Sequence, residues 1–123
     1  MRPRAAAPSV PPSLARGREL LASGNYSQAS DSFREHLGLH APDKFTITVG
    51  LYCEASNVAQ LVRSSGNAEE LFLLRVQRGG RICYALYWGL FDSWQDAQRA
   101  LDSLPLALHA AGQTPIPVSR LLR

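Results

Sequence analysis

Residues 43–123 are predicted to form an α+β domain with a four-stranded antiparallel sheet. The first observation behind this prediction is a change of hydrophobic period, from helical to strand-like, at Pro42 and Asp43. The second is the order of the patterns that follow, β-α-β-β-α-β, which packs two helices on one face of a sheet. The third is length, because 123 residues accommodate one such domain and a small N-terminal addition.

A helical hairpin is predicted before this domain, at residues 13–41. Asn25 is expected to cap its second helix, with Gln28 completing a capping box, and Gly38 is expected to end that helix. Residues 1–12 are rich in proline and alanine and predict a disordered linker. The apolar stripe of the second helix consists of Tyr26, Ala29, Phe33 and Leu37.

The strands of the domain are predicted from alternation and from turn residues. Residues 45–49 alternate apolar and polar side chains, which indicates a half-buried strand. Two further strands, at 71–77 and 81–90, flank Gly79-Gly80, which suits the positive φ angles of a type I′ hairpin turn. Residues 115–122 are expected to add a final edge strand, where prolines are tolerated.

Two helices are expected to connect these strands. Apolar residues spaced i, i+3, i+4 and i+7 predict the first helix at 55–65. Asp92 and Ser93 are expected to cap the second helix, with Asp96 as the capping-box partner, and Pro105 is expected to stop or bend it. This arrangement of strands and helices is called ferredoxin-like.

The tight turn pairs Arg78 with Arg81 and thereby sets the register of the hairpin. The set of pairs that ends in Trp88 is bulkier and is expected beneath the two helices. The remaining positions form an apolar surface on the other side of the sheet, here called the platform face. It consists of Thr46, Thr48, Phe72, Leu74, Val76, Cys83, Ala85 and Tyr87. The platform face is expected either to be covered, by the helical hairpin or by a partner chain, or to stack Phe72 and Tyr87 against an elongated ligand.

Two strand-glycine-aromatic segments carry a resemblance to a known family. Residues 45–52 read FTITVGLY, and residues 84–91 read YALYWGLF and continue as DSWQDAQRALDSLP at 92–105. Over residues 43–123 they resemble the SPOR (sporulation-related repeat) domain, a bacterial peptidoglycan-binding module. The resemblance implies a non-catalytic module of the cell envelope. On the open face of its sheet, such a module binds septal glycan strands that lack stem peptides.

The same resemblance suggests which residues contact the ligand. Thr48 and Leu51 stand where the family usually has glutamine and serine. Residues 21–37 are similar to the end of a tetratricopeptide repeat, and this hairpin is expected to lean on the SPOR-like domain. The expected ligand-binding residues are Thr46, Thr48, Leu51, Phe72, Leu74, Arg75, Arg81, Cys83, Ala85 and Tyr87.

Catalytic and metal-binding chemistry is not expected. No catalytic motif occurs, so the chain is predicted to be neither an enzyme nor dependent on a cofactor. Cys53 and Cys83 lack metal-ligand spacing, and the expected helix end at Gly38 separates His36 from His40. A disulfide between the cysteines is left open. Strand order favours their contact, whereas alternation places Cys53 with the core and Cys83 on the platform face.

Two alternatives to glycan binding use the same apolar face. One is a protein-interaction or dimerisation domain. The other is RNA binding, because RRM domains share this order of elements, although Cys83 and Ala85 are poor stacking groups. The net charge of +3 comes from scattered arginines and does not demand a nucleic-acid partner.

The sequence leaves two cellular locations open. No apolar run approaches the roughly 20 residues needed to span a bilayer. No signal peptide is visible at the N-terminus either. The chain is therefore expected in the cytoplasm, or at the cell envelope as part of a longer exported chain.

Overall fold

The computed structural model describes residues 11–65, 70–105, 108–109 and 113–122. Most of the predicted linker at 1–12 lies outside these residues. Its last residue, Pro12, begins the first helix, where a missing N–H and a fixed φ angle are well tolerated.

The described residues form an α+β fold, as the sequence predicts, with one four-stranded antiparallel sheet in the order β2-β3-β1-β4. The strands are β1 (Phe45–Tyr52), β2 (Leu71–Arg78), β3 (Arg81–Phe91) and β4 (Pro115–Pro117). The helices are α1 (Pro12–Ala22), α2 (Tyr26–His40), α3 (Ala55–Ser64), α4 (Trp94–Ala100), the 3₁₀ turn η1 (Leu101–Ser103) and α5 (Val118–Leu121).

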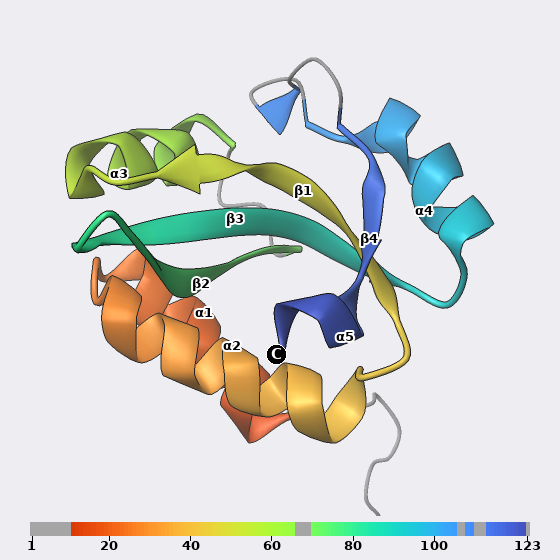
Figure 1. Cartoon of the computed structure of the whole chain (residues 1–123), viewed down its shortest axis with the longest axis horizontal. Helices are drawn as coiled ribbons and strands as arrows, with labels where there is room; N and C mark the ends of the chain where they lie inside the picture. The colour runs from red at the N-terminus through yellow and green to blue at the C-terminus, as the bar shows by residue number, and fades with distance from the viewer. Residues whose placement is uncertain (1–10, 66–69, 106–107, 110–112, 123) are drawn as a thin grey trace, which may run out of the picture.

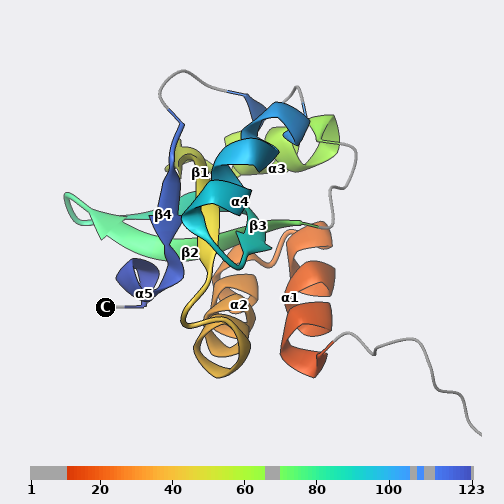
Figure 2. The same cartoon turned by 90° about the vertical axis from the view of Figure 1, so that its right-hand side faces the viewer.

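The helices lie on both sides of the sheet. Figures 1 and 2 show α3 and α4 on one side and the α1–α2 pair on the other, with α5 on the side of α2. Ile47, Leu73 and Leu86 are buried and alternate with Phe72 and Tyr87, and Phe72 faces α2, so these three core residues lie on the α3–α4 side, as expected. Of the alternatives considered for the platform face, the structure therefore shows coverage by the N-terminal helix pair.

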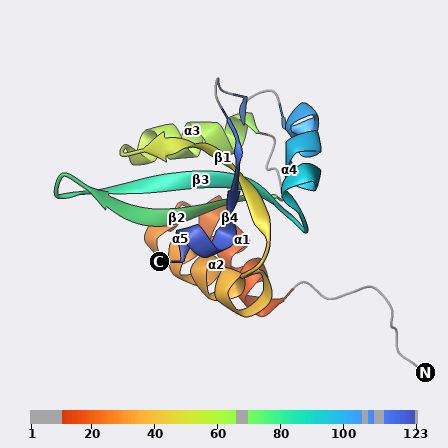
Figure 3. The ribbon, with the colours of Figure 1, turned by 45° about the vertical axis from the view of Figure 1, so that its right-hand side comes forward.

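The α1–α2 pair belongs to the same hydrophobic core as the sheet. The ring of Phe33 on α2 lies 5.9 Å from the ring of Phe72 on β2, centroid to centroid. Gly17 allows α1 to approach closely, because a Cβ atom at this position would lie 2.8 Å from the Phe33 ring. Figure 3 shows the pair stacked beneath the long β2–β3 hairpin.

The predicted register of this hairpin is confirmed. The pairs run from Arg78 opposite Arg81 to Leu71 opposite Trp88. Both turn glycines have positive φ angles, 57° at Gly79 and 80° at Gly80, as a two-residue primed turn requires.

The two strand-glycine-aromatic segments share one local geometry. The register of β1 against β3 shifts between Thr48 and Gly50, and it shifts again opposite Gly89, which has a φ angle of 81°. In both segments the aromatic ring two residues further on lies over the glycine. A Cβ atom at Gly50 would meet Tyr52 at 2.9 Å, and one at Gly89 would meet Phe91 at 2.5 Å. Each motif is thus a β-bulge whose glycine makes room for an aromatic ring.

The first bulge explains why alternation is misleading at the cysteines. Beyond it, Tyr52 stands opposite Tyr84, so the next residues along the strands, Cys53 and Cys83, are neighbours. They form a disulfide, with their Cα atoms 4.0 Å apart. The prediction that alternation separates them is wrong, because one extra residue at a bulge reverses the side on which every later side chain lies.

Three predicted boundaries differ in the structure. Helix α2 continues through Gly38 to His40, because an exposed glycine lowers helix stability without breaking the helix. Asn25 occupies the N-cap position, but its side-chain amide donates to Ser23 Oγ, so no capping box forms. The last strand has only three residues, and α5 replaces the rest of the expected strand. By contrast, the predicted cap of α4 is confirmed, since Ser93 Oγ accepts the N–H of Asp96.

Candidate functional site

The large residues of the platform face are buried inside the chain. Phe72, Leu74 and Tyr87 are 4%, 1% and 8% exposed, and the Phe72 and Tyr87 rings stack at 5.4 Å. Thr46, Cys83 and Ala85 are buried as well, and the Thr46 hydroxyl donates to the carbonyl of Gly89. These residues come together as a core layer between the sheet and α2.

Two helices are joined on this side of the sheet by one hydrogen bond. The Arg34 guanidinium of α2 donates to the Leu121 carbonyl of α5, over a distance of 3.1 Å. Burial raises the pKa of the Tyr87 phenol, and the nearby Arg34 and Arg78 partly oppose that rise. A ligand that stacked on the Tyr87 ring would therefore have to displace helix α2 from the sheet.

The remaining predicted ligand-binding residues lie apart from this layer. Leu51 is 45% exposed, and Thr48 is half-buried. Arg75 pairs with Asp31 at 3.7 Å, and Arg81 pairs with Glu54 at 2.9 Å. The structure thus brings the apolar members of the predicted site together in the core and leaves Leu51 and the two arginines at the surface.

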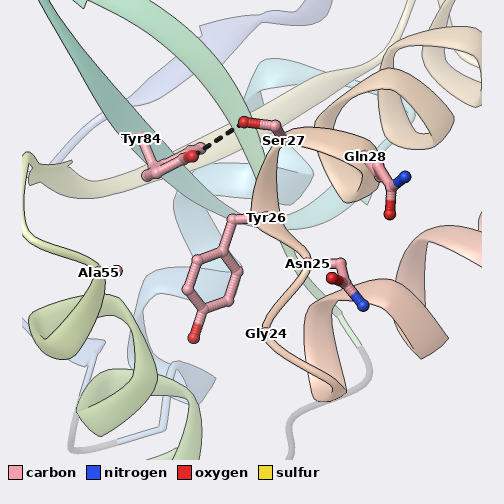
Figure 4. A pocket seen from close by; sticks show the side chains of 7 residues that line it. All are labelled: Gly24, Asn25, Tyr26, Ser27, Gln28, Ala55 and Tyr84. Atoms are coloured by element: carbon pink, nitrogen blue, oxygen red, sulfur yellow. Dashed lines mark hydrogen bonds between the residues drawn. The ribbon is translucent and has the colours of Figure 1, made fainter.

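A different group of residues lines a hollow of about 310 Å³ beside the start of α2 (Figure 4). It lies between the α1–α2 turn, the first turn of α2, the first residue of α3 and strand β3. We call it the tyrosine hollow. Its lining residues are Gly24, Asn25, Tyr26, Ser27, Gln28, Ala55 and Tyr84.

The two tyrosines of the hollow come from distant parts of the sequence. Tyr26 is the first residue of α2, and Tyr84 is the fourth residue of β3, where it pairs with Tyr52 of β1 and Arg75 of β2. The Tyr26 and Tyr84 rings meet edge to face at 5.7 Å, a favoured aromatic geometry. The hydroxyls of Ser27 and Tyr84 share a hydrogen bond of 3.0 Å, shown as a dashed line in Figure 4.

The disulfide fixes the wall of the hollow that Ala55 and Tyr84 form. Cys83 precedes Tyr84, and its partner Cys53 lies two residues before Ala55. Arg81 reinforces the link, because its guanidinium donates to the Cys53 carbonyl at 3.2 Å and to the Glu54 carboxylate at 2.9 Å. The start of α3 and the first residues of β3 are thereby held together.

The chemistry of the tyrosine hollow is polar and uncharged. Burial raises the pKa of the Tyr26 phenol, while the Arg63 guanidinium acts in the opposite direction. The other polar groups are the Asn25 and Gln28 amides and the Ser27 hydroxyl. Among the described residues, no group of three or more His, Cys, Asp or Glu side chains is placed to hold a metal ion. The arrangement can therefore stack against a ring and exchange hydrogen bonds with a neutral ligand.

Comparisons with known proteins assign no family. No protein-family description, no curated protein and no solved structure matches the chain. Within the described part, none of the helices has the length and apolar character needed to cross a membrane.

The amino-acid sequence predicts other roles for the two tyrosines. Tyr26 is expected in the apolar stripe of a helix, and Tyr84 is expected beneath the two helices with Arg75. One signal in the sequence could have placed Tyr84 at the surface, namely its predicted pairing with Arg75. A tyrosine opposite an arginine is a poor core pair and marks the edge of the core. Nothing in the sequence indicates that the start of α2 reaches Tyr84.

Proposed function

We propose that this chain is a non-catalytic binding module of the bacterial cell envelope, which recognises peptidoglycan glycan strands in the tyrosine hollow. The observation that carries the proposal is the lining of that hollow, which combines two tyrosine rings with two side-chain amides on the other side of the first turn of α2 (Figure 4). A sugar ring has an apolar C–H face for an aromatic ring and a rim of hydroxyl and acetamido groups for amides. The tyrosine hollow has a volume of about 310 Å³, which lies at the lower end of the range for small-molecule sites.

Two further features support the location and the ligand class. A disulfide such as Cys53–Cys83 persists in oxidising compartments, which include the periplasm and the cell surface. The strand order β2-β3-β1-β4 is compatible with a ferredoxin-like arrangement, and each of the two segments that resemble SPOR motifs forms a glycine-aromatic bulge.

A ligand in the tyrosine hollow lies away from the platform face. That face is occupied by α2, through the Phe33–Phe72 contact and the hydrogen bond from Arg75 to Ser30. A partner protein or an RNA molecule would meet the same obstacle there. The tyrosine hollow, in contrast, is formed by the helix pair and the sheet together, so the packing of α2 creates it.

Sedimentation with purified sacculi tests the proposal. Wild-type protein is expected to co-sediment with amidase-treated sacculi more than with intact sacculi. Gln28→Ala should weaken this binding several-fold, because it removes an exposed amide from the hollow. Gln98→Ala is the matched control, since Gln98 is an exposed glutamine on the distant helix α4. Absence of wild-type binding, or equal binding by the wild type and Gln28→Ala, would contradict the proposal.

A further inference from the structure

A second hollow, of about 280 Å³, lies next to the tyrosine hollow. The two hollows share Gly24 and Tyr26, so the Tyr26 residue stands between them. We call the second one the arginine hollow, because its lining includes Arg63 of α3. Its walls otherwise include the apolar side chains of Leu21, Ala59 and Val62.

Arg63 supplies the positive charge at this position. Its side chain is exposed, and it has no carboxylate partner among the described residues, whereas Arg75 and Arg81 each have one. Its charge also reaches the Tyr26 phenol, where it acts to lower the pKa. Because Arg63 and Tyr26 line the same hollow, the guanidinium lies on the side of α3 that faces the shared tyrosine.

We propose that the arginine hollow binds the free carboxylate of an acidic amino sugar, whose neighbouring sugar occupies the tyrosine hollow. This inference rests on the proposed function and specifies its ligand. Arginine presents a planar fork of donors that matches a carboxylate and forms charge-assisted hydrogen bonds with it. The apolar wall beside it suits a small alkyl group close to that carboxylate.

One sugar of peptidoglycan has this chemistry. N-acetylmuramic acid carries a lactyl ether, which consists of a methyl group and a carboxylate on one carbon. A stem peptide converts the carboxylate into a neutral amide, and removal of the peptide restores the charge. Recognition by Arg63 would thus give a physical reason for preferring strands that lack stem peptides.

Arg63 also has a structural role that the test must separate from binding. It lies in the last turn of α3, where a positive charge complements the helix dipole. Loss of this effect would lower stability slightly and would reduce the affinity for charged and neutral sugars alike. A carboxylate subsite instead predicts that only the charged sugar is affected.

The experiment compares two disaccharides by isothermal titration. The first is N-acetylglucosamine joined to N-acetylmuramic acid, and the second is N,N′-diacetylchitobiose, which lacks the lactyl group. Wild-type protein is expected to bind the first about three- to tenfold more tightly, as suits one partly exposed charged contact. Arg63→Gln should abolish this preference, and Arg63→Lys should keep part of it. Arg120→Gln, which removes an exposed arginine from α5, should leave the preference unchanged.

The outcomes separate the two proposals. Equal wild-type affinity for both disaccharides, or a preference that survives Arg63→Gln, would overturn the carboxylate subsite and leave sugar binding intact. Failure of the wild type to bind either disaccharide would overturn both the subsite and the proposed function.

Discussion

The Arg75 backbone N–H donates a hydrogen bond of 2.7 Å to the Ser30 hydroxyl, and this bond joins the free edge of β2 to helix α2. Arg75 belongs to the pairs of β2 whose N–H groups point away from β3, so a side chain from outside the sheet has to satisfy it. An exposed edge strand is a template for pairing with other chains, and a covering helix is one way to block it. Ser30 itself is buried, at 2% exposure.

Removing this hydroxyl should leave the part-buried Arg75 N–H without its partner. Ser30→Ala is expected to lower the free energy of unfolding by about 1 kcal/mol, the usual net contribution of such a hydrogen bond. Urea denaturation followed by circular dichroism measures the change. Ser27→Ala is a suitable comparison, because its hydroxyl bonds only the half-buried Tyr84 phenol and should cost less. A smaller loss for Ser30→Ala than for Ser27→Ala would argue against the role of Ser30 at the sheet edge.

The platform face should behave as core in mutational tests. Phe72→Ala is expected to destabilise the fold by about 3–5 kcal/mol, because Phe72 packs against both Phe33 and Tyr87. Ile82→Ala, at a β3 position that is 49% exposed, should cost much less. Chemical denaturation of both variants checks the contrast. A Phe72→Ala protein of nearly wild-type stability would show that α2 does not cover this face in solution.

The disulfide should contribute measurably to stability. The cysteines are 30 residues apart in sequence, and closing a loop of this size is worth about 2–4 kcal/mol in the unfolded-state entropy account. The double variant Cys53→Ser with Cys83→Ser is therefore expected to unfold at lower denaturant concentration than the oxidised protein. It should also bind sugars more weakly, because the disulfide holds the start of α3 beside Tyr84. Two reactive thiols in protein purified under oxidising conditions would contradict the assignment of the bridge.

The stability of the helix pair should depend on pH through His36. This histidine is 6% exposed, and its ring lies 5.1 Å from that of His40. Burial lowers the pKa of His36, and the charges of His40 and Arg18 lower it further. The unfolded chain then binds this proton more readily than the folded chain, so the stabilising contribution is complete above the unfolded pKa of about 6.5. It is lost as the pH falls from that value towards the lower folded pKa.

A pH series of denaturation curves between about pH 7.5 and 5 measures this dependence. In the wild type the free energy of unfolding should fall as the pH is lowered, and this pH dependence should be weaker in His36→Gln. His109→Gln is the control, because His109 lies in another part of the fold and bonds the Leu104 carbonyl. A slope that is unchanged by His36→Gln would show that another group dominates.

The α+β class and the hairpin register could be predicted because they depend on local signals. The turn at Gly79 and Gly80 sets every pair from Arg78–Arg81 to Leu71–Trp88, and alternation holds wherever the ladder is regular. The same rule fails at Cys53, because the bulge at Gly50 adds one residue to β1. The signal for the bulge, a glycine followed two residues later by an aromatic, is present in the sequence, but its meaning depends on how the ring folds over the glycine.

The candidate site was less accessible to prediction because it depends on how separate elements pack. Tyr26 and Tyr84 are 58 positions apart, and their contact follows from the way α2 crosses the edge of β2. The sequence left open whether the helix pair covers the platform face, since an apolar stripe such as Phe33 and Leu37 shows that a helix must dock but not where.

The most direct test of the central claim is an NMR titration of ¹⁵N-labelled protein with the disaccharide of N-acetylglucosamine and N-acetylmuramic acid. If the glycan binds in the tyrosine hollow, the largest amide shifts will cluster at Gly24 to Gln28, Ala55 and Tyr84. Saturable shifts at these positions, with little change at Phe72 and Tyr87, are the predicted result. No shifts at saturating sugar, or shifts confined to the platform face, would contradict the account.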